Sequence, residues 1–182
     1  MNSVLITPPA IEPLTLAEAK AHLRVEHSAD DAVITTLISV ARQWAEVYLR
    51  RALITQTWQL LLSSLPERLE LPKAPLQSIT HVKAFDAADV ASVVSPSVYQ
   101  ADTAATPGAL VLRAGAVWPD AGRTTNGYEV QYVAGYGTAA SSVPAPIRQG
   151  LLQHIAALYE NRGDETPPAL SLALYAPYRV LR

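Results

Sequence analysis

The 182-residue sequence contains no cysteine, so disulfides, thiolate metal sites and a cysteine nucleophile are all excluded. Assembly in the cytoplasm is compatible with that composition. The sequence also has no run of about eighteen apolar residues, so we expect no segment to span a membrane. Its first ten residues have neither a basic start nor a long apolar run, and we therefore expect no signal peptide.

The sequence also lacks a large excess of positive or negative charge. Fourteen Lys and Arg against sixteen Asp and Glu give a formal net charge of −2. Tight binding to nucleic acid through phosphate neutralisation needs a strong basic field, so that class of protein is not favoured.

The common catalytic and cofactor-binding motifs are missing as well. No G-x-S-x-G elbow marks a serine nucleophile, and the Gly135–Thr138 stretch lacks the lysine of a phosphate-binding loop. His22 and His27 lie near Asp30 and Asp31, but without the helical pairing with glutamate that marks a zinc hydrolase. We therefore expect no catalytic residue, no cofactor and no metal.

Apolar residues, in contrast, make up 49% of the sequence, enough for a core without covalent staples. Residues 28–50 predict one long amphipathic helix, because apolar residues recur at three- and four-residue steps. Ser28 and Asp31 have the spacing of a capping box at its start. We expect Leu37 and Trp44 to be buried against two other helices. Further apolar positions widen the stripe and indicate either two partners or one partner and a second subunit: Val33, Val40 and Trp44.

Elsewhere the pattern alternates between helix and strand signals. Residues 1–13 predict an extended lead-in because prolines recur there, and Thr15 with Glu18 forms a capping box that opens a short helix. We predict an α+β fold: a small helical bundle built on the long helix, with an inserted small antiparallel β-sheet of five or six strands. The helical parts cover residues 14–51 and 146–176, the β-rich insertion covers about 53–136, and residues 1–182 form a single domain.

The carboxyl-terminal segment, residues 169–182, is apolar, aromatic and basic together. It is too short to fold alone and too apolar to remain in water, so it must dock on its own core or on a partner. Tyr175 and Tyr178 are candidate anchors, and Arg179 and Arg182 candidate polar contacts at the rim of an interface.

In order and spacing, several stretches resemble the head–tail connector proteins, also called adaptor or head-completion proteins, of tailed phages and gene transfer agents. They span nearly the whole chain: 14–20, 22–25, 30–31, 38–42, 45–46, 53–58, 132–137, 143–151 and 177–179. The resemblance implies a single connector domain with no catalytic residues. It implies a structural role in a ring beneath the portal that extends the DNA channel and provides the platform for tail attachment.

The partners that the resemblance implies are the portal protein, neighbouring adaptor subunits in a ring of about twelve, and the next tail-side connector or stopper protein. The expected location is the head–tail interface of a virion or phage-like particle assembled in the bacterial cytoplasm. DNA is expected to pass through the channel without tight binding, and no membrane is involved. We expect the carboxyl-terminal segment to be mobile in the free protein and to order on assembly. The residues expected at subunit or portal contacts are Arg42, Glu46, Tyr175, Tyr178, Arg179 and Arg182.

Two other classes of protein stay open at this point. One is a small enzyme of unrecognised class, for which a deep pocket with converging polar groups would be evidence. The other is a binding module of the host, which would remain a monomer in solution.

Overall fold

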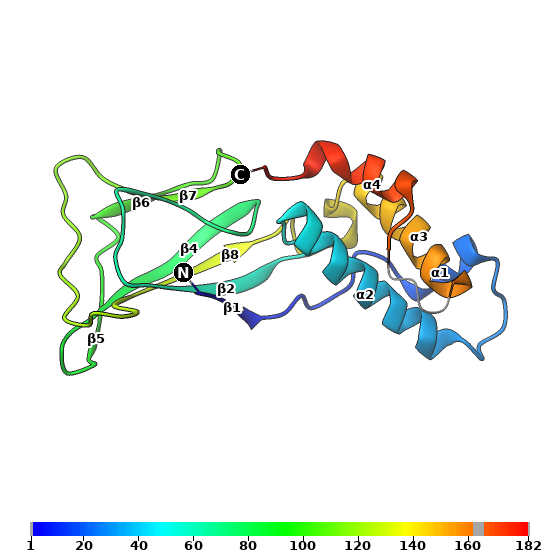
Figure 1. Cartoon of the computed structure of the whole chain (residues 1–182), viewed down its shortest axis with the longest axis horizontal. Helices are drawn as coiled ribbons and strands as arrows, with labels where there is room; N and C mark the ends of the chain where they lie inside the picture. The colour runs from blue at the N-terminus through cyan, green and yellow to red at the C-terminus, as the bar shows by residue number, and fades with distance from the viewer. Residues whose placement is uncertain (1, 162–165, 182) are drawn as a thin grey trace. The chain divides into compact units, whose positions relative to one another are not determined.

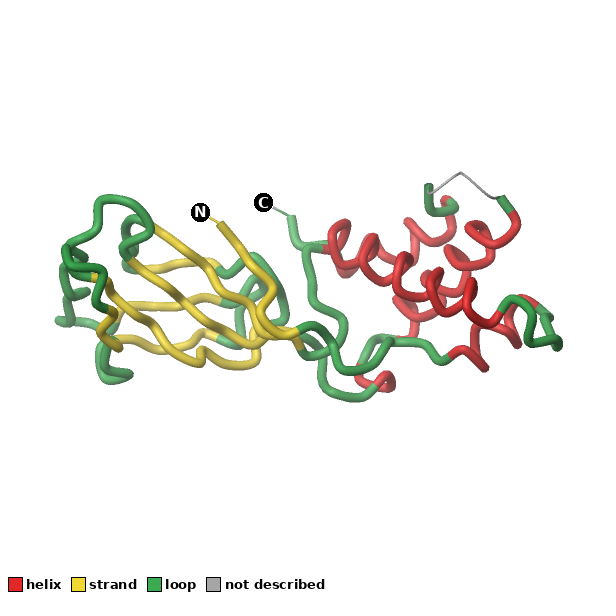
Figure 2. The backbone as a smooth tube through the Cα atoms, turned by 90° about the horizontal axis from the view of Figure 1, so that it is seen from below, coloured by secondary structure: helices red, strands yellow, loops and turns green. Residues whose placement is uncertain are grey.

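The computed structural model describes residues 2–161 and 166–181, and the chain divides into two compact units. The strand unit comprises Met1–Pro8 and Thr55–Gly135, and the helical unit comprises Pro9–Ile54 and Tyr136–Arg182. Figure 2 shows the segregation directly, with strands in one unit and the long helices in the other. The predicted α+β class is confirmed. That the whole chain acts as one domain stays a prediction.

The larger sheet of the strand unit has five antiparallel strands in the order β1-β2-β8-β4-β5 (Figure 1). Alternating polar and apolar residues in the sequence predict strands near residues 55–62, 77–85 and 127–135, and these are present as β2, β4 and β8. β1 and β5 were not predicted: β1 forms where the sequence favoured an extended lead-in, because it pairs along β2. The strand bounds are β1 Asn2–Thr7, β2 Gln56–Leu62, β4 Leu76–Phe85, β5 Ala91–Val93 and β8 Tyr128–Ala134.

The remaining strands form a second, three-stranded antiparallel sheet in the order β3-β7-β6, where the sequence predicted a single sheet. Its strands are β3 Arg68–Glu70, β6 Tyr99–Asp102 and β7 Ala109–Leu112. Gly108, just before β7, lies so close to β4 that a Cβ there would be 2.4 Å from the Cβ of Leu76. The absence of a side chain at residue 108 therefore lets the small sheet approach the large one.

Alternation along β8 defines the two faces of the large sheet. Tyr128, Val130, Tyr132 and Ala134 are buried, whereas the residues between them are only half-buried. This period of two is the pattern of a strand with one face on the core and one face toward water.

The helical unit contains four α-helices and two short 3₁₀ turns among the residues described. The capping box at Thr15 and Glu18 is confirmed at the start of α1. The one predicted at Ser28 is wrong: α2 begins at Asp31 after an Asp30 N-cap without a side-chain cap, and Ser28 accepts from the Asp31 N–H through its carbonyl. The bounds are α1 Leu16–Leu23, α2 Asp31–Leu49, η1 Ala140–Ser142, α3 Ala145–Glu160, α4 Ala169–Tyr175 and η2 Ala176–Tyr178.

The core of the helical unit lies between α2, α3, α1 and α4. On α2 the fully buried face comprises Ile34, Ile38, Ala41, Ala45 and Leu49. Leu37 and Trp44 pack beside this core and are only half-buried, so the prediction that both are buried between helices is wrong. They lie at the border between the inner face of α2 and its solvent-facing side.

Candidate assembly interface

Arg42 and Glu46, which we expected at a subunit contact, hold the helical unit together internally. Nη1 of Arg42 donates to Oε2 of Glu46 at 2.9 Å, and its Nε donates to Glu12 at 2.7 Å. Oε1 of Glu46 accepts from the N–H of Leu53 at 2.9 Å. The two side chains are about nine-tenths buried, at 10% and 8% exposure. They therefore clamp the segments before α1 and after α2 onto α2, and their role between subunits stays a prediction.

The described part of the carboxyl-terminal segment packs on its own unit. Tyr175 is fully buried against α3, and the hydroxyl of Ser171 donates to the Gly150 carbonyl at 2.9 Å. Beyond α4, the N–H of Val180 donates to the Leu49 carbonyl at 3.1 Å. Of the two docking alternatives, residues 169–181 therefore adopt the one on their own core, because the segment buries its apolar surface on α3 and the end of α2. Its mobility in the free protein stays a prediction. Arg182 lies outside the described residues.

Three arginines gather where α2 ends, and we call Arg50, Arg51 and Arg179 the basic end. The guanidinium of Arg179 lies 4.7 Å from the ring centroid of Tyr48, and that of Arg51 lies 5.7 Å from the ring of Tyr136. Nε of Arg51 also donates to the carbonyl of Tyr178. Within the described residues none of the three arginines makes an ion pair. Their positive charges complement the negative end of the α2 dipole. They also make this end of α2 a positively charged part of the surface.

The solvent-facing side of α2 carries a second apolar stripe, which we call the outer seam: Val33, Leu37, Val40, Trp44 and Val47. Val33 is 52% exposed and Val47 is 73% exposed. Trp44 stacks on Tyr48 with ring centroids 5.2 Å apart and meets His154 of α3 edge-on at 5.5 Å. The tryptophan is thus held in place while one side of the stripe stays open.

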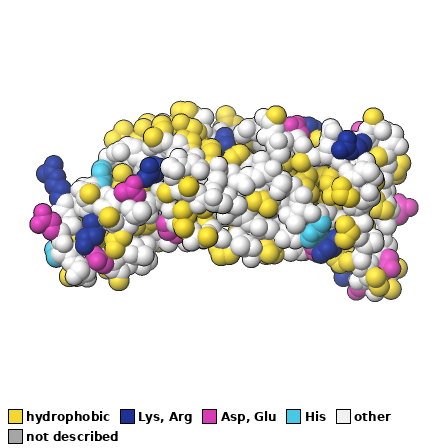
Figure 3. Space-filling view, turned by 180° about the vertical axis from the view of Figure 1, so that it is seen from behind, with side chains coloured by type: hydrophobic (Ala, Val, Ile, Leu, Met, Phe, Trp, Pro, Cys, Tyr) yellow, Lys and Arg dark blue, Asp and Glu magenta, His cyan; other side chains and the backbone are white. Residues whose placement is uncertain are grey.

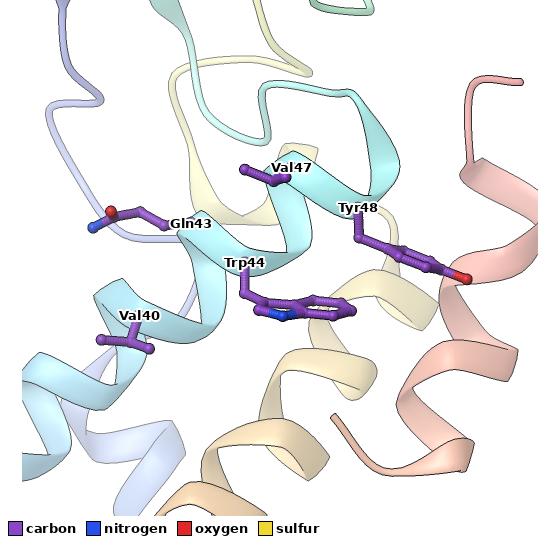
Figure 4. A pocket seen from close by; sticks show the side chains of 5 residues that line it. All are labelled: Val40, Gln43, Trp44, Val47 and Tyr48. Atoms are coloured by element: carbon purple, nitrogen blue, oxygen red, sulfur yellow. The ribbon is translucent and has the colours of Figure 1, made fainter. Parts of the chain in front are cut away.

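A groove of about 450 Å³ runs along this stripe, lined by Val40, Gln43, Trp44, Val47 and Tyr48. Figure 4 shows all five side chains projecting from α2, with Trp44 and Tyr48 side by side above the neighbouring helices. Its lining contains no acid, base or nucleophile apart from the Tyr48 hydroxyl. The groove is therefore suited to bind an apolar surface rather than to perform chemistry.

The half-buried face of the large sheet holds a cluster of polar side chains centred on Glu129. Oε1 of Glu129 is 2.8 Å from both Nζ of Lys83 and Nε2 of His81, and its other oxygen accepts from Gln59 at 2.9 Å. Burial raises the pKa of Glu129, but hydrogen bonds from Lys83 and His81 outweigh it, so that the pKa lies below its ordinary value. Such a fully bonded, charge-compensated carboxylate stabilises a sheet and is not set up as a catalytic base.

In the part of the chain that the structure covers, no group of three or more potential metal-ligating side chains is brought together. None of its helices combines the length and apolarity needed to cross a bilayer.

Residues 13–92 match the family described as "Phage gp6-like head-tail connector protein". The whole chain is also similar to a subunit in the neck of an empty gene transfer agent particle computed with C6 symmetry. That match has 26% identity and a TM-score of 0.85, and it covers 100% of this chain and 97% of the other. These matches support a head–tail connector protein of a phage or gene transfer agent.

Two further solved structures extend this likeness over the same shares of the two chains, 100% and 97%. One is the virion of a native gene transfer agent particle, at 25% identity and a TM-score of 0.86. The other is the neck of a native particle computed with C12 symmetry, at 26% identity and a TM-score of 0.82. No curated protein sequence matches the chain. The matching proteins are structural parts of particles, and this connector is a structural protein rather than an enzyme.

The sequence predicted only part of the candidate interface formed by the outer seam and the basic end. The spacing of apolar residues in the sequence predicted the widened apolar stripe of α2, and the outer seam includes that stripe. The exposure of Val47 was not predicted, and neither was the grouping of Arg50 with Arg179, which depends on where residues 176–181 pack. Tyr175 is buried within the unit, so its expected partner role stays a prediction, whereas Tyr178 and Arg179 lie at the edge of the surface.

Proposed function

We propose that this protein forms a ring beneath the portal of a phage or phage-like particle, extends the DNA channel there, and provides the platform for tail attachment. The observation that carries the proposal is the full-length match to a neck subunit, at a TM-score of 0.85 over 100% of this chain. Fold similarity alone does not define a function. Here the family description and the location of the similar subunits support the same role.

The proposed ring contains about twelve copies. The similar necks were computed with C6 and with C12 symmetry, and twelve subunits satisfy both. A closed ring requires each subunit to present two different, complementary faces, since a self-complementary face closes a dimer instead. A monomer with a large uncovered apolar stripe is compatible with such a subunit.

The proposed partners are the portal on the head side, a further connector or stopper protein on the tail side, and neighbouring copies within the ring. The whole chain, with its strand unit and its helical unit, acts as one connector. Tyr178 and Arg179 remain candidates for a portal contact because they lie at the surface near the end of the described chain, and Arg182 remains one from the sequence.

The test is an image reconstruction of particles that contain the tagged protein, compared with particles from cells lacking its gene. The proposal predicts a ring of density for this chain at the portal vertex, and tailless heads when the gene is absent. Particles with a complete neck in the absence of the chain, or a chain located elsewhere in the particle, would refute the proposal.

A further inference from the structure

We propose that the outer seam of α2 is the face on which each copy in the ring receives a helix of the neighbouring copy. This inference rests on the proposed function and adds which surface of the subunit makes the contact between copies. Among the apolar surfaces left open in the described residues, the seam combines a groove with the spacing of a helix-packing interface.

The spacing of the seam matches what one helix requires from another. From Val33 to Val47 the apolar positions follow steps of four, three, four and three residues. This alternation keeps side chains aligned along one line of a helix, as in the contact positions of a coiled coil. The fourteen residues of rise correspond to about 21 Å, or nearly four turns. An extended peptide or a small molecule would not need that regular length.

Packing inside the monomer explains only part of the seam: Leu37 and Trp44 lie beside the core, whereas Val33 and Val47 stay exposed. The inner face of α2 already supplies the core through residues such as Ile34, Ile38 and Leu49. Val47, at 73% exposure, lies on the opposite side. Uncovered apolar stripes of this kind mark contact surfaces in soluble proteins.

A second copy is the occupant that the observations favour. The similar subunits stand in necks with sixfold and twelvefold symmetry, where every copy has an identical neighbour on each side. A helix of that neighbour fits a groove that runs along a helix. In a heterologous contact, each copy receives a helix from one neighbour in its groove and inserts a helix into the groove of the other neighbour. Tyr48 and Trp44 would be the central aromatic anchors.

The basic end supplies a polar rim for this contact. Arg50 and Arg179 are exposed cations without a carboxylate partner in the described part of the chain. Arg50 also adopts φ = 56°, a left-handed conformation that glycine adopts with less strain. The backbone N–H of Arg50 caps the end of α2, and we assign its exposed side chain to a carboxylate of the neighbouring copy.

Photo-cross-linking in assembled particles tests the occupant. The photoreactive residue p-benzoylphenylalanine replaces Val47 in one variant and Thr35 in the control. Thr35 is exposed on α2 but lies about 160° around the helix from the middle of the seam. We expect the variant at residue 47 to give a dimer band whose cross-linked peptides come from a helix of a second copy, and the control to give none. Peptides from any other protein, or cross-links within one chain only, would overturn the inference.

Charge and backbone variants test the same surface in solution. Val47→Glu should weaken ring formation by at least about tenfold, because the contact would bury an unpaired carboxylate. Thr35→Glu should leave it unchanged. Arg50→Gly should weaken ring formation without lowering the thermal midpoint of the monomer, since glycine relieves the left-handed backbone. Oligomer mass is measured over a range of concentrations, and circular dichroism verifies folding.

The outcomes separate this inference from the proposed function. Wild-type protein missing from the neck refutes the function. A wild-type ring that Val47→Glu leaves unchanged refutes only the seam as its contact. If Val47→Glu does not fold, Arg50→Gly and the cross-link at residue 47 still test whether the seam is the contact between copies.

Discussion

The ring of Tyr175 in α4 lies directly against the backbone of Gly150 in α3. A Cβ at residue 150 would be 2.5 Å from Cε1 of Tyr175, closer than side chains pack. Glycine in the interior of a helix normally costs stability relative to alanine. Here the lack of a side chain creates the space in which the tyrosine ring is buried, and it determines how the carboxyl-terminal segment docks.

Gly150→Ala should therefore destabilise the protein, although the same change in an unobstructed helix would stabilise it. We expect a loss of about 1–3 kcal/mol, because the added methyl group overpacks the contact with Tyr175. Urea unfolding followed by circular dichroism measures the difference. Gln149→Ala, at an exposed neighbouring position, is the control and should change the unfolding free energy by less than about 0.5 kcal/mol. Higher stability for Gly150→Ala would mean that α4 does not pack as described.

Removal of residues 169–182 should lower the thermal midpoint of the free protein by at least about 5 °C. The deletion exposes the surface of α3 that Tyr175 covers, and it removes the hydrogen bond from Val180 to Leu49. Calorimetry on the truncated and full-length proteins provides the comparison. A midpoint unchanged by the deletion would indicate that the segment is undocked in solution and is ordered only by partners.

The sequence predicted local structure where a single segment determines it. The capping box at Thr15 and the alternation of β8 both follow from neighbouring residues, and the structure has them. β1 was missed because its residues are exposed on both faces and are held in place by pairing with β2, more than fifty positions away. Propensity carries little information about such an edge strand.

The candidate interface shows the same division between local and distant causes. The widened apolar stripe of α2 was readable from periodicity alone. The burial of Arg42 was not, because it depends on Glu12 from the segment before α1 and on Glu46 one turn away. The sequence pattern predicts that a polar residue on a helix faces solvent, and it does not show whether a distant segment covers that residue in the fold.

Glu46→Gln should lower the free energy of unfolding by about 3 kcal/mol. This is the low end of the range for removing one partner of a buried ion pair, since Arg42 keeps Glu12. A double-mutant cycle with Arg42→Met, measured by urea unfolding, should show that the two effects are not additive. Glu26→Gln, at an exposed position, is the control. If Glu46 instead contacts another subunit, its substitution would reduce ring assembly and leave the unfolding free energy of the monomer unchanged.

Duplex DNA should bind the isolated protein only weakly at physiological salt. The net charge is −2, and the face in Figure 3 shows Lys and Arg scattered among other side chains rather than gathered in a stripe. Affinity for phosphates requires several neutralising cations together. Fluorescence anisotropy with a labelled duplex should give a dissociation constant weaker than about 10⁻⁶ M. Sub-micromolar binding with a steep salt dependence would contradict a channel that lets DNA pass.

Stability should depend on acid pH through Glu129. Its pKa in the folded protein lies below the ordinary value of 4.5, since hydrogen bonds from Lys83 and His81 outweigh the opposing effect of burial. A carboxylate with a lowered folded pKa adds stability that is present above pH 4.5 and is lost as the pH falls through the folded value. Glu129→Gln should thus be less stable than the wild type at pH 7, and the difference should shrink steadily below pH 4.5. Urea midpoints measured from pH 7 to pH 3 follow this convergence, with the exposed Glu70→Gln as the control that should parallel the wild type throughout. A difference that stays constant down to pH 3 would show that the charge of Glu129 does not contribute to the stability of the sheet.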